Sequence, residues 1–80
     1  MMYEPTDVDL VFMAQMLGLL TEGGLLVFPS SGLIYKVSHY QKTLTLQNPA
    51  KLKDPDMQKM HEMTAYVASF FMYEVKEATQ

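Results

Sequence analysis

The most constraining feature of this chain is a segment near its start that would be apolar on nearly every side of a helix. Between residues 10 and 20, only Gln15 and Gly18 are not apolar. A helix that packs on one core needs an apolar stripe only about 100° wide. We therefore expect this helix to be covered on two sides, by the rest of the fold or by a partner.

Signals at both ends bound this first helix. Thr6 or Asp7 is a suitable N-cap, because its side-chain oxygen can accept a hydrogen bond from a backbone N–H of the first turn. Gly23 can take the left-handed conformation that follows many helices, and Gly24 lets the chain turn into an extended run. The predicted helix covers residues 7–21.

Two small residues, Ala14 and Gly18, lie four positions apart and so share one face of this helix. Such a pair allows the backbone of a neighbouring helix to approach closely. The crossing helix would belong to the same fold or to a second copy across a dimer axis. The alternative is an incidental pair of small residues without a packing role.

Three short extended segments follow the first helix. Residues 25–28 are an apolar run, the Pro-Ser-Ser-Gly sequence after them is typical of a turn, and residues 33–38 and 43–47 alternate between apolar and polar. These ranges are predicted to be three strands of an antiparallel meander with one sheltered face. The side chains expected to face the core are Leu33, Tyr35, Val37, Leu44 and Leu46.

The last predicted helix has the clearest start in the sequence. Asp54 fits the N-cap, Pro55 the first helical position and Asp56 the positive end of the helix dipole. The helix is predicted to cover residues 55–78.

Two apolar stripes run along this helix. The stripe expected to lie on the sheet consists of Met57, Met60, Thr64, Val67, Phe71, Val75 and Ala78. The second stripe consists of Met63, Tyr66, Phe70 and Tyr73. It either packs on the first helix or forms a surface for a partner, for which tyrosine provides large contact area at low entropic cost.

The order of these elements predicts an α+β domain. We expect a two-layer α-β-β-β-α arrangement in which a three-stranded antiparallel meander packs against two helices. Residues 1–80 are expected to form a single domain, because segments shorter than about 50 residues rarely form a core of their own.

Composition suggests that such a domain has more apolar surface than it can bury. Of the 80 residues, 49% are hydrophobic and 19% are charged, and there is no cysteine to form a disulfide. A chain of this size buries only about 60% of its unfolded surface. Self-association is a common remedy, so we expect a homo-oligomer, most simply a dimer. The eight methionines suit either a core or an adaptable binding surface.

The sequence has no pattern typical of an active site or a cofactor site. His39 is expected to be solvated at a hairpin tip and His61 to lie on a helix surface. Gly23 and Gly24 follow a helix, whereas phosphate-binding glycines precede one. We therefore expect a protein that is not an enzyme and binds no cofactor or metal.

The charges leave nucleic-acid binding as a less favoured alternative. The net charge is −3 and the six basic residues are all lysine, whereas nucleic-acid binders are usually basic and rich in arginine. Most lysines lie within residues 36–59, which could form a patch for an acidic partner or a weak nucleic-acid contact. The residues of this predicted patch are Lys36, His39, Tyr40, Lys42, Lys51 and Lys53.

The leading hypothesis is a small interaction module that acts by contact. The acidic first residues are unlike a secretory signal, and charges within residues 8–28 argue against a membrane span, so a cytoplasmic protein is expected. It would be a homodimeric adaptor or inhibitor that binds an unidentified protein, as accessory proteins of phages and mobile elements often do. A carrier of small apolar ligands is a third alternative, if the methionines line a cavity.

Overall fold

The computed structural model describes residues 7–29 and 31–78. Its elements, in chain order, are α1 (Asp7–Leu19), β1 (Leu25–Val27), β2 (Ile34–Ser38), β3 (Thr43–Leu46), the 3-10 helix η1 (Pro49–Lys53), α2 (Pro55–Ser69) and β4 (Glu74–Glu77). The predicted α+β class is confirmed, and so is the presence of two helices. Thr6, one of the two candidate caps of α1, lies outside the described residues.

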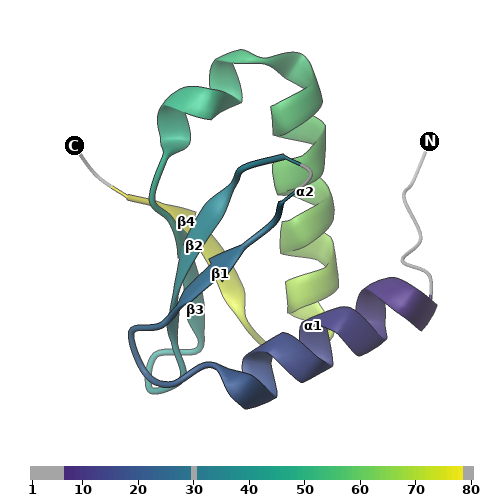
Figure 1. Cartoon of the computed structure of the whole chain (residues 1–80), viewed down its shortest axis with the longest axis vertical. Helices are drawn as coiled ribbons and strands as arrows, with labels where there is room; N and C mark the ends of the chain where they lie inside the picture. The colour runs from purple at the N-terminus through teal and green to yellow at the C-terminus, as the bar shows by residue number, and fades with distance from the viewer. Residues whose placement is uncertain (1–6, 30, 79–80) are drawn as a thin grey trace.

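The strands form one mixed sheet with the order β1-β2-β3-β4. The first three strands are the predicted antiparallel meander, in which Tyr35 pairs with Leu26 on one side and with Leu46 on the other. A fourth strand, β4, pairs with β3 in parallel, so that Leu44 lies opposite Val75. Both helices lie on the same side of this sheet, which leaves the other side open (Figure 1).

The core lies between the sheet and the helices. Leu33, Tyr35, Val37, Leu44 and Leu46 are all fully buried, as their alternation in the sequence predicts. The helices contribute Met13 from α1 and Val67 and Ala68 from α2. The opposite side chains of the strands, such as Lys36, face the open side of the sheet, because successive residues of a strand point to opposite faces.

The prediction of one long helix over residues 55–78 is wrong, because α2 ends at Ser69 and the chain returns as β4. The end of the helix is a Schellman motif, with hydrogen bonds from Met72 N to Ser69 O and from Tyr73 N to Ala68 O, both 3.1 Å. Met72 occupies the left-handed position of this motif with φ of 65°. The apolar spacing continues through Val75 without a glycine or proline, so the sequence carries no signal of the turn.

The glycine pair after α1 acts in a turn that lies beyond the helix end. Gly23 has the expected positive φ, 81°, but α1 already ends at Leu19. The Gly23 N–H donates to Val37 O over 2.8 Å, which joins the turn to β2. The left-handed conformation of Gly23 thus lets its N–H reach β2 as the chain enters the sheet.

Helix α1 is covered on one side only. Its buried side includes Met13, whereas Val11, Ala14 and Leu19 are exposed. The second cover that its composition predicts is therefore not supplied by the part of the chain that the structure describes. Within residues 7–29 and 31–78, no helix is both long enough and apolar enough to cross a bilayer.

Candidate interaction surface

Three members of the predicted apolar stripe are exposed: Met63 and Tyr66 on α2, and Phe70, the C-cap residue of this helix. Met63, Tyr66 and Phe70 show 36%, 36% and 53% of their surface to solvent. The rings of Tyr66 and Phe70 lie edge to face, with their centroids 5.3 Å apart. They hold each other in place, because residues four apart on a helix are neighbours on one face. We call these three residues the α2 face.

The fourth predicted member, Tyr73, does not belong to this face. It is buried, and it lies after the end of α2, in the segment that leads into β4. Its hydroxyl is hydrogen-bonded to His39 Nδ1 over 2.7 Å. Because the helix stops four residues earlier, the spacing that placed Tyr73 on the stripe no longer applies.

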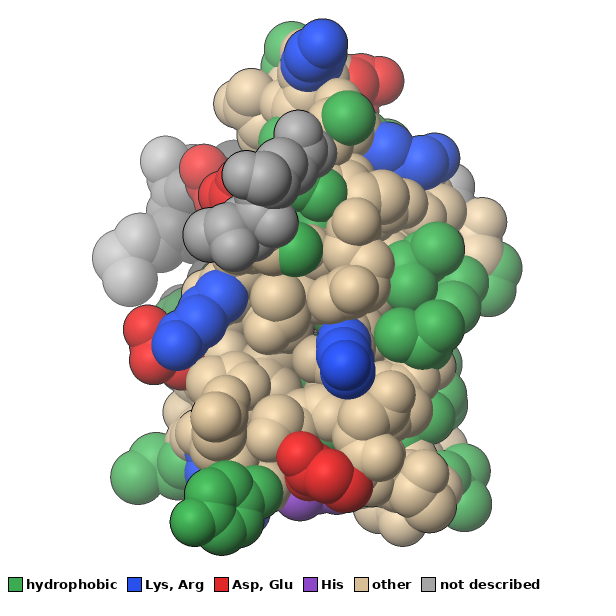
Figure 2. Space-filling model, turned by 90° about the vertical axis from the view of Figure 1, so that its left-hand side faces the viewer, with side chains coloured by type: hydrophobic (Ala, Val, Ile, Leu, Met, Phe, Trp, Pro, Cys, Tyr) green, Lys and Arg blue, Asp and Glu red, His purple; other side chains and the backbone are tan. Residues whose placement is uncertain are grey.

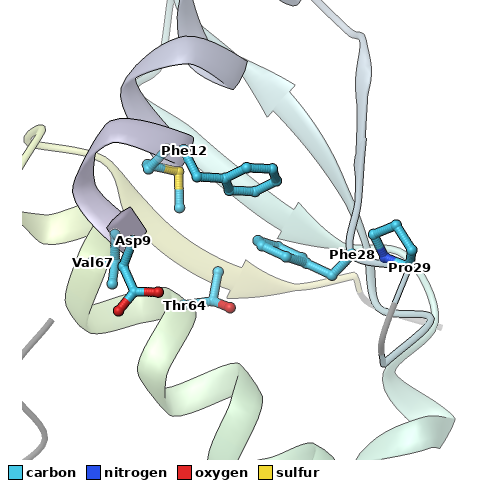
Figure 3. Close-up of a pocket in the computed structure, with 7 residues that line it drawn as sticks. Asp9, Phe12, Phe28, Pro29, Thr64 and Val67 are labelled. Carbon is cyan, nitrogen blue, oxygen red and sulfur yellow. The ribbon is translucent and has the colours of Figure 1, made fainter. Parts of the chain in front are cut away.

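A pocket of about 470 Å³ opens between the two helices and the turn after β1. Figure 3 shows that it brings together segments far apart in the sequence. Its described lining includes Asp9, Phe12, Met13, Phe28, Pro29, Thr64 and Val67.

The pocket walls are mostly aromatic and aliphatic, with two oxygen-bearing side chains among the lining residues. The rings of Phe12 and Phe28 have their centroids 5.8 Å apart and are tilted by 46°. Asp9 and Thr64 add oxygen atoms at one side, and the Thr64 hydroxyl donates to Met60 O over 2.9 Å. Such a site is suited to an apolar group that also carries a hydrogen-bond donor.

Sequence reasoning missed this pocket. Phe12 appears in the sequence as one of many apolar residues of α1, and Phe28 as the end of a strand. Only the packing of α1 beside the turn after β1 brings them together. Met13 is the one methionine in the described lining, so the idea of a methionine-lined ligand cavity gains no support from it.

The predicted helix-packing pair, Ala14 and Gly18, lies on the exposed side of α1. A Cβ atom added at Gly18 would meet no atom within 4 Å. The residues that the structure describes therefore supply no helix that crosses α1 closely at this point. Packing of this pair across a dimer axis stays a prediction.

The predicted lysine patch is divided between separate parts of the fold. His39, Tyr40 and Lys42 lie in the turn between β2 and β3, while Lys51 and Lys53 lie in η1. These two segments are at opposite ends of β3 (Figure 1). Lys36, in the middle of β2, lies on the open side of the sheet. The six residues therefore do not form one continuous patch.

His39 is not a solvated tip residue, because it joins three segments of the fold. Its Nε2 donates to Leu20 O over 2.6 Å, and its Nδ1 is 2.7 Å from the hydroxyl of Tyr73. A carbonyl oxygen only accepts, so Nε2 carries a proton, and in the neutral ring the Tyr73 hydroxyl donates to Nδ1. His39 thus ties the end of α1 to the turn before β4.

Glu22 fixes the same turn from the side of α1. Its carboxylate accepts hydrogen bonds from Ser38 Oγ and from the backbone N–H groups of His39 and Tyr40, over 2.7, 2.6 and 3.1 Å. The hydrogen bond from Ser38, followed by those of the backbone, lowers the pKa of Glu22 below its usual value. The turn between β2 and β3 is therefore held on both sides.

His61 also has a structural partner, and its predicted place on the helix surface is only half right. It is partly buried, its Nδ1 is 2.8 Å from the Tyr35 hydroxyl, and the two rings are stacked with an interplanar angle of 8°. Burial raises the pKa of Tyr35 to about 12. Both histidines are thus paired with tyrosines that anchor the core.

The part of the chain that the structure describes contains no group of three histidine, cysteine, aspartate or glutamate residues that could hold a metal ion. Comparison with known proteins gives no match: no family model fits the chain, and no curated protein or solved structure is significantly similar to it. The α2 face and the neighbouring pocket are therefore the features on which a functional proposal rests.

Proposed function

We propose that this protein is a small non-catalytic interaction module that forms homodimers and binds another protein, as an adaptor or inhibitor. The observation that carries the proposal is the exposed aromatic and methionine cluster on α2, on the same side of the sheet as the pocket beside α1. Large contact energies at protein interfaces come mostly from a few aromatic anchors and the pockets that they fill.

Further exposed apolar residues on the helices support a role of the α2 face in binding a partner. Val11 and Phe12 on α1 and Met60 on α2 are exposed in addition to the α2 face. Single exposed apolar residues are ordinary, whereas a contiguous exposed apolar patch marks an interaction site. We infer that Phe12, which lines the pocket together with Thr64 and Val67 of α2, extends the α2 face into such a patch. The helix side of the domain is thus suited to a partner with an apolar surface.

The alternative of weak nucleic-acid binding has less support. Phosphate contacts are strongest where several basic groups face one backbone. The lysines of the predicted patch are divided between the turn before β3, η1 and the open side of β2. The adaptor or inhibitor role therefore remains the better proposal.

The test is capture of partner proteins from the native host on immobilised protein, followed by quantitative mass spectrometry. We expect the double variant Tyr66→Ala and Phe70→Ala to capture at least about tenfold less of the specific partner than the unmodified protein does. The variant should retain its fold, because neither side chain belongs to the buried core: Tyr66 is 36% and Phe70 53% exposed. Tyr73 is left unchanged, since its burial would confound the result.

Tyr40→Ala is the matched control for the double variant. Tyr40 is 92% exposed and lies in the turn between β2 and β3, away from the α2 face. This variant should capture the partner as well as the unmodified protein. Equal capture by the double variant and the control, with both folded, would refute the proposed surface.

A further inference from the structure

The two edges of the sheet that residues 7–29 and 31–78 leave unpaired differ in their chemistry. The strand at one edge, β4, has the sequence Glu-Val-Lys-Glu, and its charges oppose the approach of another strand. The strand at the other edge, β1, has the sequence Leu-Leu-Val and carries no charge. Natural proteins usually protect edge strands with charge, proline or a bulge. β1 is short, and the two hydrogen bonds by which Gly23 and Gly24 both face Val37 form a β-bulge just before it, but within residues 25–27 the strand has no charge, proline or bulge.

The backbone of β1 has hydrogen-bonding groups directed away from the sheet. Gly24 O accepts from Val37 N over 2.9 Å, and Phe28 N donates to Leu33 O over 3.0 Å, so these two residues face β2. Residues alternate in direction along an antiparallel strand. The N–H and C=O groups of Leu25 and Val27 therefore point outward, to the free edge.

The side chains of the same two residues are exposed. Leu25 is 52% and Val27 is 44% accessible, and both lie on the open side of the sheet, where Val27 pairs with Ile34. Figure 2 shows this side of the molecule: apolar side chains gather along one side of it, while polar and charged groups occupy most of the rest. Unpaired backbone and exposed apolar side chains thus occur together at β1.

We propose that a second copy of this chain pairs with β1 in antiparallel orientation, about a two-fold axis at Leu26. Leu25 would then lie opposite Val27 of the partner subunit, and Val27 opposite Leu25 of the partner subunit. Each of these two pairs would exchange two backbone hydrogen bonds, four in all. The side chains of these residues from both copies would cover one another on the open face. The proposal names the surface of the homodimer and rests on the proposed function only in the expectation of self-association.

A second copy is the occupant that this edge fits. A strand centred on Leu26 is self-complementary, because its two outward-facing residues are both apolar and are placed symmetrically about the axis. Stable interfaces bury about 1,200–2,000 Å², and a three-residue edge contributes less than that. The dimer is therefore weak, and its population rises with protein concentration.

Amide hydrogen exchange measured by NMR at two protein concentrations tests the pairing directly. We expect the amides of Leu25 and Val27 to exchange at least about threefold more slowly at millimolar than at micromolar concentration. Val75 and Glu77 serve as internal controls, because Glu74 N and Ala78 N donate to β3 and the intervening alternate residues face the other free edge. Protection at Val75 and Glu77 instead of β1 would overturn the proposal.

Sedimentation of charge variants identifies the surface independently. The double variant Leu25→Lys and Val27→Lys should be monomeric at the concentrations at which the unmodified protein dimerises. The control, Val11→Lys and Leu19→Lys, adds the same charge to the exposed side of α1, beside Ala14 and Gly18, and should still dimerise. A monomeric control with a dimeric β1 variant would assign the dimer to α1 and refute the edge pairing, as would a protein that is monomeric throughout.

Two further measurements keep the outcomes distinct. If the lysine variant does not fold, Val27→Pro removes the outward N–H without affecting the bonds to β2, because proline is tolerated at this kind of edge position. The folded β1 variant should still capture the partner protein, and the Tyr66→Ala, Phe70→Ala variant should still dimerise. Dimerisation through β1 and partner binding through the α2 face are therefore tested independently, and a negative result for one leaves the other open to its own test.

Discussion

At the scale of single residues, the least expected conformation belongs to Met72. It has φ of 65°, a left-handed conformation that residues with a side chain adopt at a cost of about 1 kcal/mol or more. Glycine is the usual residue at this position of a Schellman motif. Because the Met72 side chain is 83% exposed, little packing offsets the strain.

We predict that Met72→Gly increases the free energy of unfolding by about 0.5–1 kcal/mol. Relief of the left-handed strain exceeds the added freedom of glycine in the unfolded chain. Urea unfolding followed by circular dichroism would measure the change. Met72→Ala removes the same side chain but retains the strain, so it should change stability little. An equal gain in both variants would contradict the explanation.

The two histidines show where reasoning from single residues fails. His39 and His61 were expected to be solvent-exposed, yet each contacts a tyrosine that lies 34 or 26 positions away in the sequence. Polarity predicts exposure only when no partner is near. No local pattern indicates that a distant tyrosine hydroxyl will lie within hydrogen-bond distance of either ring.

At the scale of elements, the correct placement of β4 depends on the chain segment just before it. Glu74 N donates to Lys42 O over 2.9 Å at the start of β4, next to the bond between Tyr73 and His39. Lys42 Nζ also lies 5.1 Å from the centre of the Tyr73 ring. Tyr73 therefore joins β4 to the turn between β2 and β3.

We predict that Tyr73→Phe lowers the free energy of unfolding by about 1–2 kcal/mol. The ring packing is kept, but His39 Nδ1 loses its hydrogen-bond partner in a partly buried site. Thermal or urea unfolding would measure the loss. Tyr40→Phe is the control for removing a hydroxyl, since Tyr40 is exposed, and it should be neutral. A neutral Tyr73→Phe would show that the hydrogen bond is not needed to place β4.

The fourth strand shows which elements can be predicted from sequence and which cannot. The meander is marked by alternation and by turn residues, and α2 begins where Asp54 accepts a hydrogen bond from Asp56 N over 2.9 Å, as its cap signal predicts. β4 has a single partly buried apolar residue, Val75, which fits a helical spacing equally well. What selects the strand is the free edge of β3, which exists only after the meander has formed.

At the scale of the whole molecule, Tyr35 lies where the sheet meets α2. It is fully buried, it lies edge-on to Phe28 with the ring centroids 5.8 Å apart, and its hydroxyl is bonded to His61. Because burial raises its pKa to about 12, the folded state favours the neutral phenol more than the unfolded state does. The neutral phenol of Tyr35 therefore contributes its full share of the free energy of unfolding below about pH 10. This contribution is lost as the pH rises from 10 to about 12.

We predict that the free energy of unfolding falls by about 2–3 kcal/mol more over this range in the unmodified protein than in Tyr35→Phe. The variant has no phenol to ionise, so this part of its pH dependence should disappear. Urea unfolding at several pH values between 9 and 12 would measure both proteins. Parallel pH profiles would show that ionisation of Tyr35 is not coupled to unfolding.

The two proposed binding surfaces lie on different parts of the molecule. The α2 face and the pocket lie on the helix side, whereas pairing through β1 extends the sheet at its edge. One subunit could therefore dimerise and hold a partner at the same time. A dimer would then present two α2 faces, which raises its apparent affinity for any partner that can engage both.

The sequence by itself determined the class of fold, the three strands of the meander, the faces of its core residues and the start of α2. These features depend on periodicity and on local hydrogen bonds, which are determined by residues close together in the sequence. The tertiary structure decided the end of α2, the parallel strand β4, the two histidine–tyrosine pairs and the pocket beside Phe12. Each of these requires segments that are distant in sequence to meet, and their contact energies do not exist until the core has formed.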